Sequence, residues 1–181
     1  MWENTSTWVP GVTATGVHPD AKATNVRHLS LRERVDLWFI EPLKRQKKDE
    51  AFIALMIMLP LIEKLVRYRL HFDDKTQLKF GDGSKALREL AKLLGPASEA
   101  EAKAFWKCFR HGMAHRAMVK SEIKYALMPG VGAKPVLTVD GRVLVYVWQL
   151  RDRIVKELEA VGAKLWKDTT CPLPEVYQEL V

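Results

Sequence analysis

The feature that most constrains this fold is an apolar run, Phe52–Ile62, which is eleven residues long. A helix that begins at Asp49 or Glu50 and continues to about His71 would carry this run. Because the run is apolar on every side, the helix is expected to be buried on all sides, either in a bundle centre or at a subunit interface. It is roughly half as long as a bilayer-spanning helix, so no membrane association is expected.

Composition limits the class of protein further. The chain has 181 residues, 48% hydrophobic and 28% charged, which fits one domain with its own core. Two cysteines, Cys108 and Cys171, are too few for a disulfide framework or a four-thiolate zinc site. With no signal-peptide pattern in view, a cytoplasmic location is expected. The net charge of +7 favours an acidic partner such as nucleic acid, although a merely soluble cationic surface explains it equally well.

Capping and periodicity predict a mainly α fold, with about five helices in a bundle and a small β-hairpin inserted before the last long helix. The helices are expected over residues 26–43, 49–71, 85–94, 99–119 and 148–166. Ser30 with Glu33, and Ser98 with Glu101, have the spacing of capping boxes. Residues 25–167 would form the helical domain, after an irregular N-terminal arm (1–24) and before a C-terminal tail (168–181).

Between the fourth and fifth helices the apolar period changes to that of strands. Alternating residues over 123–127, 135–139 and 142–147 predict a small antiparallel sheet. Asp140-Gly141 between the last two segments is a strong signal for a two-residue hairpin turn.

The helix predicted over 99–119 carries the residues with most chemical potential. On a helical wheel its core face holds Ala102, Phe105, Trp106, Phe109, Met113 and Ala117. A cationic stripe beside that face holds Lys103, Lys107 and Arg110. His111 and His115 lie one turn apart on a shared face. Arg116 falls on the core face, which indicates that the helix ends or bends near Gly112.

An arginine and a histidine that face one phosphodiester are sufficient for RNA cleavage without a metal. The arginine is permanently charged and grips a phosphate through two N–H groups. The histidine titrates near neutral pH and can accept or donate a proton. The ribose 2′-hydroxyl supplies the nucleophile, so the protein only moves protons and stabilises the charge that develops on phosphorus.

The string Arg110-His111-Gly112-Met113-Ala114-His115 resembles the signature of the HEPN superfamily, in which an arginine is followed by a histidine after four to six residues. The resemblance implies a four- or five-helix fold that commonly forms homodimers, with two motif helices facing each other across a shared cleft. It implies a metal-independent endoribonuclease without a cofactor, often a toxin of a toxin–antitoxin pair or a defence effector. His115 would be the acid/base group, Arg110 the phosphate clamp and His111 a polar helper.

Glu63 is a fourth catalytic candidate, because HEPN proteins often carry an acidic residue on an earlier helix. A carboxylate near His115 would orient the ring and raise its pKa. The alternative is a surface ion pair between Glu63 and Arg67 at i+4. Lys103, Lys107 and Arg116 are the candidates for RNA binding.

Other functions remain open from the sequence. The main alternative is a non-catalytic HEPN module that binds RNA or a partner protein, such as an antitoxin or a nucleotidyltransferase. A plain helical scaffold is a further alternative. His111 and His115 have i, i+4 spacing that suits a metal, but no third ligand is evident, so no metal is expected. Cys108 lies at the core edge and is expected to be a packed apolar residue instead of a nucleophile.

Overall fold

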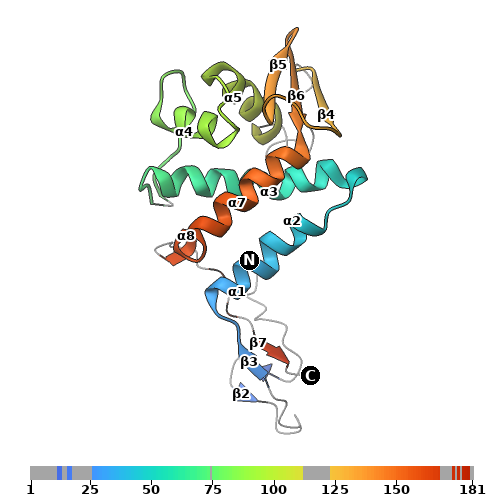
Figure 1. The fold of residues 1–181 in the computed structure, drawn as a ribbon. Coiled ribbons are helices and arrows are strands. Elements are labelled where there is room, and N and C mark those ends of the chain that lie inside the picture. Colours follow the sequence, from blue (N-terminus) through green and yellow to red (C-terminus); the bar gives the residue numbers. More distant parts are fainter. Residues whose placement is uncertain are drawn as a thin grey trace, which may run out of the picture.

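The computed structural model describes residues 12–13, 16–17, 26–73, 75–111, 123–167, 173, 175 and 177–179 (Figure 1). Within these ranges the chain is mainly α-helical with a small three-stranded sheet, so the predicted fold class is confirmed at that level. Helix α3 (Ala51–Arg69) crosses the middle of the molecule. Helix α7 (Val147–Val161) packs along it, while α4 (Lys85–Leu93) and α5 (Glu99–Phe105) lie on the side of the sheet.

The first helical segment is continuous from Leu31 to Arg45. It consists of α1 (Leu31–Val35), a π-helical stretch η1 (Asp36–Ile40) and α2 (Glu41–Arg45). The predicted capping box is present, because the Ser30 hydroxyl accepts from the Glu33 N–H and the Glu33 carboxylate accepts from the Ser30 N–H.

The prediction that this helix begins at residue 26 was wrong. Strand β3 (Val26–His28) instead pairs antiparallel with β7 (Tyr177–Glu179), inside the predicted C-terminal tail. The backbone partners come from about 150 positions away in the chain, which local periodicity does not register. Within the predicted N-terminal arm, the two-residue strands β1 (Val12–Thr13) and β2 (Gly16–Val17) pair with each other.

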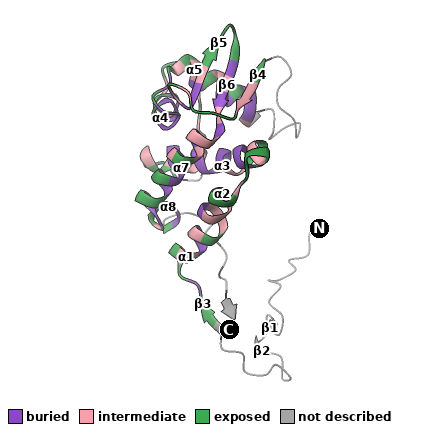
Figure 2. Cartoon of the chain, turned by 45° about the vertical axis from the view of Figure 1, so that its right-hand side comes forward, coloured by how far each residue is buried: buried purple, intermediate pink, exposed green. Residues whose placement is uncertain are grey.

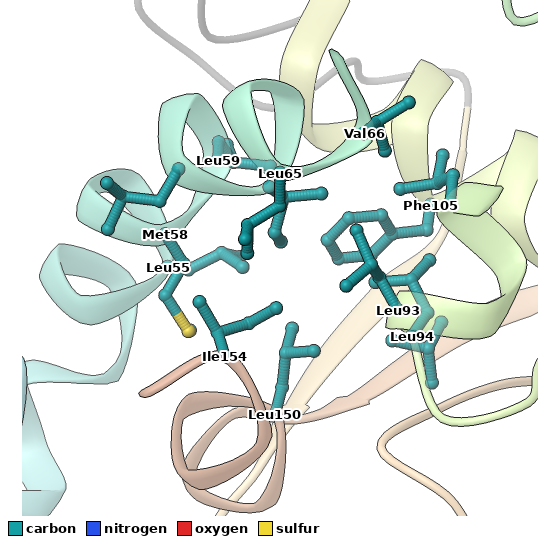
Figure 3. Close-up of a cluster of buried hydrophobic side chains, with 14 of the residues drawn as sticks. Leu55, Met58, Leu59, Leu65, Val66, Leu93, Leu94, Phe105, Leu150 and Ile154 are labelled. Carbon is teal, nitrogen blue, oxygen red and sulfur yellow. The ribbon is translucent and has the colours of Figure 1, made fainter. Parts of the chain in front are cut away.

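The core lies where α3, α4, α5 and α7 meet, as the buried residues in Figure 2 show. Leu55 and Met58 of α3 face Leu150 and Ile154 of α7, and Phe105 of α5 closes the cluster (Figure 3). Because these side chains are fully buried, shortening any of them would leave a cavity. Among the described helices, none is both long and apolar enough to cross a bilayer.

The expectation that the apolar run of α3 is buried on all sides was wrong for one face. Phe52, Ile53 and Met56 are 38%, 51% and 46% exposed. The short 3-10 turn η2 (Lys48–Glu50) precedes them, and neighbouring helices cover only the other side of α3. This face therefore forms an exposed apolar patch on the described part of the chain.

The third and fourth predicted helices are both capped as expected. Ser84 accepts a hydrogen bond from the Leu87 N–H at the start of α4, and Ser98 with Glu101 forms the capping box of α5. Helix α5 continues as a π-helix, η3 (Trp106–His111). The prediction of a helix over 99–119 is therefore confirmed as far as His111, and its remainder lies outside the described residues.

The sheet contains β4 (Tyr125–Met128), β5 (Val136–Val139) and β6 (Arg142–Tyr146), with β6 in the centre. Strands β5 and β6 form the predicted hairpin, and its turn residues Asp140 and Gly141 have φ values of 48° and 71°. The prediction of a wholly antiparallel sheet was wrong, because β4 runs parallel to β6. After β4 the chain forms β5 at the opposite edge of the sheet and returns through the hairpin as β6, which lies between β4 and β5.

The last predicted helix is interrupted. Helix α7 ends at Val161, and the short helix α8 (Lys164–Lys167) begins after Gly162. Gly162 has a φ of 56°, a conformation that favours glycine, and an added Cβ would approach Arg32 Nη1 to 2.7 Å. This backbone conformation ends α7 at Val161, inside the range 148–166 over which a single helix was predicted.

Glu101 connects α5 to the sheet. Besides capping α5, its carboxylate accepts hydrogen bonds from Lys134 Nζ and from the Thr138 N–H. Burial opposes its ionisation, but the hydrogen bonds from Lys134, Ser98 and Thr138 outweigh burial and lower the pKa of Glu101 to about 2. The ionised carboxylate therefore stabilises the folded chain.

Replacing Glu101 by glutamine is expected to lower the free energy of unfolding at pH 7 by about 1–3 kcal/mol. Since the folded-state pKa of about 2 is below the ordinary value of 4.5, the wild-type stabilisation is complete above pH 4.5 and is lost as the pH falls towards 2. Urea unfolding at several pH values measures both effects. Glu41→Gln, at a surface pair with Arg45, is the control. An acid-induced loss as steep in Glu101→Gln as in the wild type would contradict this role.

Candidate functional site

A cavity of about 620 Å³ opens beside the predicted motif helix. It lies between α3, the loop over residues 77–80 and the helix formed by α5 and η3. Its lining residues are Glu63, Arg67, Gln77, Leu78, Lys79, Phe80, Lys103, Trp106, Lys107 and Arg110. Five of these side chains are cationic and one is anionic, so the cavity is suited to an anionic ligand.

Arg110 is held at this cavity by an ion pair with Glu63. Its Nε donates to Glu63 Oε2 over 3.1 Å, and 37% of its side chain is exposed. In the part of the chain that the structure describes, neither terminal nitrogen of Arg110 makes a hydrogen bond with another residue. Glu63 therefore fixes the guanidinium through Nε, and the two Nη atoms can donate to a phosphate.

Glu63 forms the i+4 ion pair with Arg67 that was the alternative prediction for it, while its predicted place near His115 lies outside the described residues. Its Oε1 accepts from Arg67 Nη2 over 3.3 Å, which is the predicted i+4 pair, while Oε2 holds Arg110. Arg67 is fixed in turn, because its Nη1 donates to the carbonyls of Asp73 and Thr76 over 3.0 and 2.6 Å. One partly buried carboxylate thus bridges two arginines at the cavity wall.

The lysines of the predicted cationic stripe also reach the cavity. Lys103 and Lys107 line it together with Arg110, as their spacing on one helix indicated. Lys103 Nζ contacts both carboxylate oxygens of Asp82, over 2.8 and 2.6 Å. Lys107 and Lys79 are exposed, and within the described ranges they form no ion pair.

Sequence reasoning missed the opposite wall of the cavity. Phe80 packs on Trp106, with ring centroids 4.4 Å apart, and this contact places Gln77 and Lys79 across from the cationic stripe. The loop has no periodicity, so no local signal assigns it to this site. The π-helical geometry of η3 was also not predicted, although π-helical segments occur often at functional sites.

The remaining candidates are placed only in part. His111 ends η3, but its side chain, His115 and Arg116 lie outside the described residues. Cys108 is fully buried, and burial raises the pKa of its thiol to about 11, so it is the packed residue that was predicted. Among the described side chains, no three His, Cys, Asp or Glu residues gather as a metal site.

Comparisons with known proteins add no family to this picture. No family model matches the chain, and neither the curated proteins nor the solved structures contain a match. The chemistry of the site is therefore argued from its own residues.

Proposed function

We propose that this chain is a metal-independent endoribonuclease of the HEPN type, which cleaves single-stranded RNA. The observation that supports the proposal best is the guanidinium of Arg110, which Glu63 holds through Nε at the edge of a cationic cavity. This arrangement presents the two Nη atoms to a phosphate. Arg110 is also the first residue of the Arg-x4-His string, so one residue joins the geometric argument to the sequence argument.

In the proposed reaction the ribose 2′-oxygen attacks the adjacent phosphorus. His115 accepts the proton of the 2′-hydroxyl, and the bond between phosphorus and the 5′-oxygen of the next nucleotide breaks. The protonated His115 then gives its proton to that oxygen, which completes a 5′-hydroxyl end, and the other product ends in a 2′,3′-cyclic phosphate. Arg110 stabilises the negative charge that develops on the non-bridging oxygens, and His111 assists as a polar neighbour. No metal or cofactor takes part.

Glu63 acts in this proposal as the positioning residue of Arg110. A free arginine side chain loses rotamer freedom when it binds a phosphate, and an existing ion pair reduces that loss. Because Arg67 shares the same carboxylate, the cluster of Arg67, Glu63 and Arg110 keeps one net positive charge. That charge favours an incoming phosphate.

The proposed activity is tested by incubating the purified chain with single-stranded RNA in EDTA. Cleavage that leaves 2′,3′-cyclic phosphate ends is expected, and His115→Ala should abolish it. Arg142→Ala, at an exposed position of β6 outside the cavity, is the control and should cut normally. RNA binding without cleavage would indicate the non-catalytic module instead. Cleavage that survives in His115→Ala would assign the activity to another site.

We also propose that two copies of the chain associate through α3. The α3 apolar stripe, defined as Phe52, Ile53, Met56 and Pro60, is solvent-exposed. At about 100° per residue it occupies the same side of the helix as Glu63 and Arg67. A second copy that covers the stripe would therefore lie directly beside the cavity of Arg110.

A further inference from the structure

We infer that the cavity binds two neighbouring phosphates of one RNA strand, the first at Arg110 and the second at a lysine subsite. This lysine subsite consists of Lys79, Lys103 and Lys107, none of which is needed for the chemistry at Arg110. The inference rests on the proposed function only in taking RNA as the ligand. It concerns how the strand is held and not whether the strand is cut.

The spacing of the cations along the helix favours more than one phosphate. Lys103 and Arg110 are seven residues apart on the helix of α5 and η3, so their backbones differ by roughly 10 Å along its axis. A single phosphate would contact both only if the two side chains bent towards each other. Two neighbouring phosphates of one strand can contact the two ends of the row without such bending, and both ends line the same cavity.

The carboxylates that pair with the cations differ in solvent exposure between the two ends of the row. At the arginine end, Glu63 is 23% exposed and bridges Arg67 and Arg110. At the lysine end, the only described carboxylate that binds the subsite is Asp82, which contacts Lys103 and is 82% exposed. Exposed ion pairs contribute little free energy, so a phosphate can replace Asp82 at low cost.

Lys107 and Lys79 increase the unbalanced charge at the lysine end. They line opposite walls of the cavity, Lys107 on η3 and Lys79 on the loop that Phe80 anchors to Trp106. Neither forms an ion pair within the described ranges, and both are exposed to solvent. A phosphate between the two walls would be contacted from both sides, as a strand threaded through the cavity requires.

The shape of the cavity fits a short segment of strand. Its volume of about 620 Å³ falls within the range of sites that enclose a small organic ligand. Leu78, Phe80 and Trp106 add apolar surface to the lining of the cavity, against which a ribose or base can pack.

The test compares binding of 2′-O-methyl oligonucleotides, which the proposed reaction cannot cleave. A dinucleotide with one phosphate fills only the arginine end, whereas a tetranucleotide also reaches the lysine subsite. Lys79→Gln and Lys107→Gln are each expected to weaken tetranucleotide binding about 5- to 10-fold and to leave dinucleotide binding unchanged. The slope of log affinity against log salt for the tetranucleotide should also become shallower by about 0.7 in each variant.

Lys156→Gln, at an exposed position of α7 that does not line the cavity, is the control and should bind both oligonucleotides like the wild type. Equal weakening of both lengths, or of neither, would overturn the two-phosphate inference. Length-dependent binding in a chain that cannot cut unmodified RNA would overturn the proposed cleavage and support the lysine subsite. Cleavage without any length dependence would overturn the subsite alone.

Discussion

Replacing Arg110 by lysine is expected to lower the rate of RNA cleavage by about two to three orders of magnitude, the usual effect of removing one group that stabilises transition-state charge. Lysine keeps the positive charge but not the planar fork of donors. Glu63 would pair with its single ammonium group, since that carboxylate already contacts Nε of Arg110 over 3.1 Å. The remaining N–H groups of the ammonium would not have the fixed planar geometry that the two Nη atoms of Arg110 offer a phosphate.

The cleavage rate under single-turnover conditions with saturating RNA measures this effect. Arg142→Lys is the matched control, because Arg142 is exposed on β6 and does not line the cavity. The melting temperature of Arg110→Lys should stay close to that of the wild type, since the replaced side chain is 37% exposed and outside the core. A rate within threefold of the wild type would show that the charge alone matters and that the fork geometry does not.

Replacing Met56 by glutamate is expected to convert the proposed dimer to a monomer. In a twofold interface each substitution occurs twice, so two carboxylates would be brought together on a surface that now consists of Phe52, Ile53, Met56 and Pro60. Burying an unpaired charge costs several kcal/mol, so the dissociation constant should rise by at least about 100-fold. Sedimentation velocity at micromolar concentration measures the change.

Val131→Glu is the matched control for this prediction. Val131 is 83% exposed in the loop after β4, so it places the same charge on an apolar position outside the α3 apolar stripe. The control should remain dimeric. A wild-type chain that is monomeric at micromolar concentration would contradict the homodimer, and the α3 apolar stripe would then need another explanation.

Much of the fold could be predicted because its signals are local. Capping boxes at Ser30 and Ser98 depend on contacts three residues apart, and the hairpin turn at Asp140-Gly141 depends on two residues. The apolar face of α5 and η3, with Phe105 and Phe109, follows from helical spacing.

The features that were predicted wrongly depend on distant partners. Strand β3 exists because β7 pairs with it, and β4 is parallel because it joins the far edge of β6. The exposed half of α3 has the same cause. Periodicity shows that Ile53 and Met56 are apolar, but the surrounding helices decide that they face solvent.

In the candidate site, too, the features with local signals could be predicted, and those that depend on distant contacts could not. Arg110, Lys103 and Lys107 share one helix, so their spacing alone predicts that they act together. The contact between Glu63 and Arg110 spans 47 positions and was not predicted, because the family resemblance suggested only a carboxylate near His115. Lys79 reaches the cavity only because Phe80 packs on Trp106, a tertiary contact that leaves no pattern in the sequence.

The most direct test of the account measures whether Arg110 and His115 act on the same phosphate. Single-turnover cleavage rates in EDTA are compared for the wild type, Arg110→Lys, His115→Ala and the double variant. If the two residues form one catalytic unit, the double variant should be no slower than the slower single variant. Rate losses that multiply, or a single variant that cuts as fast as the wild type, would contradict the claim that these two side chains share one site.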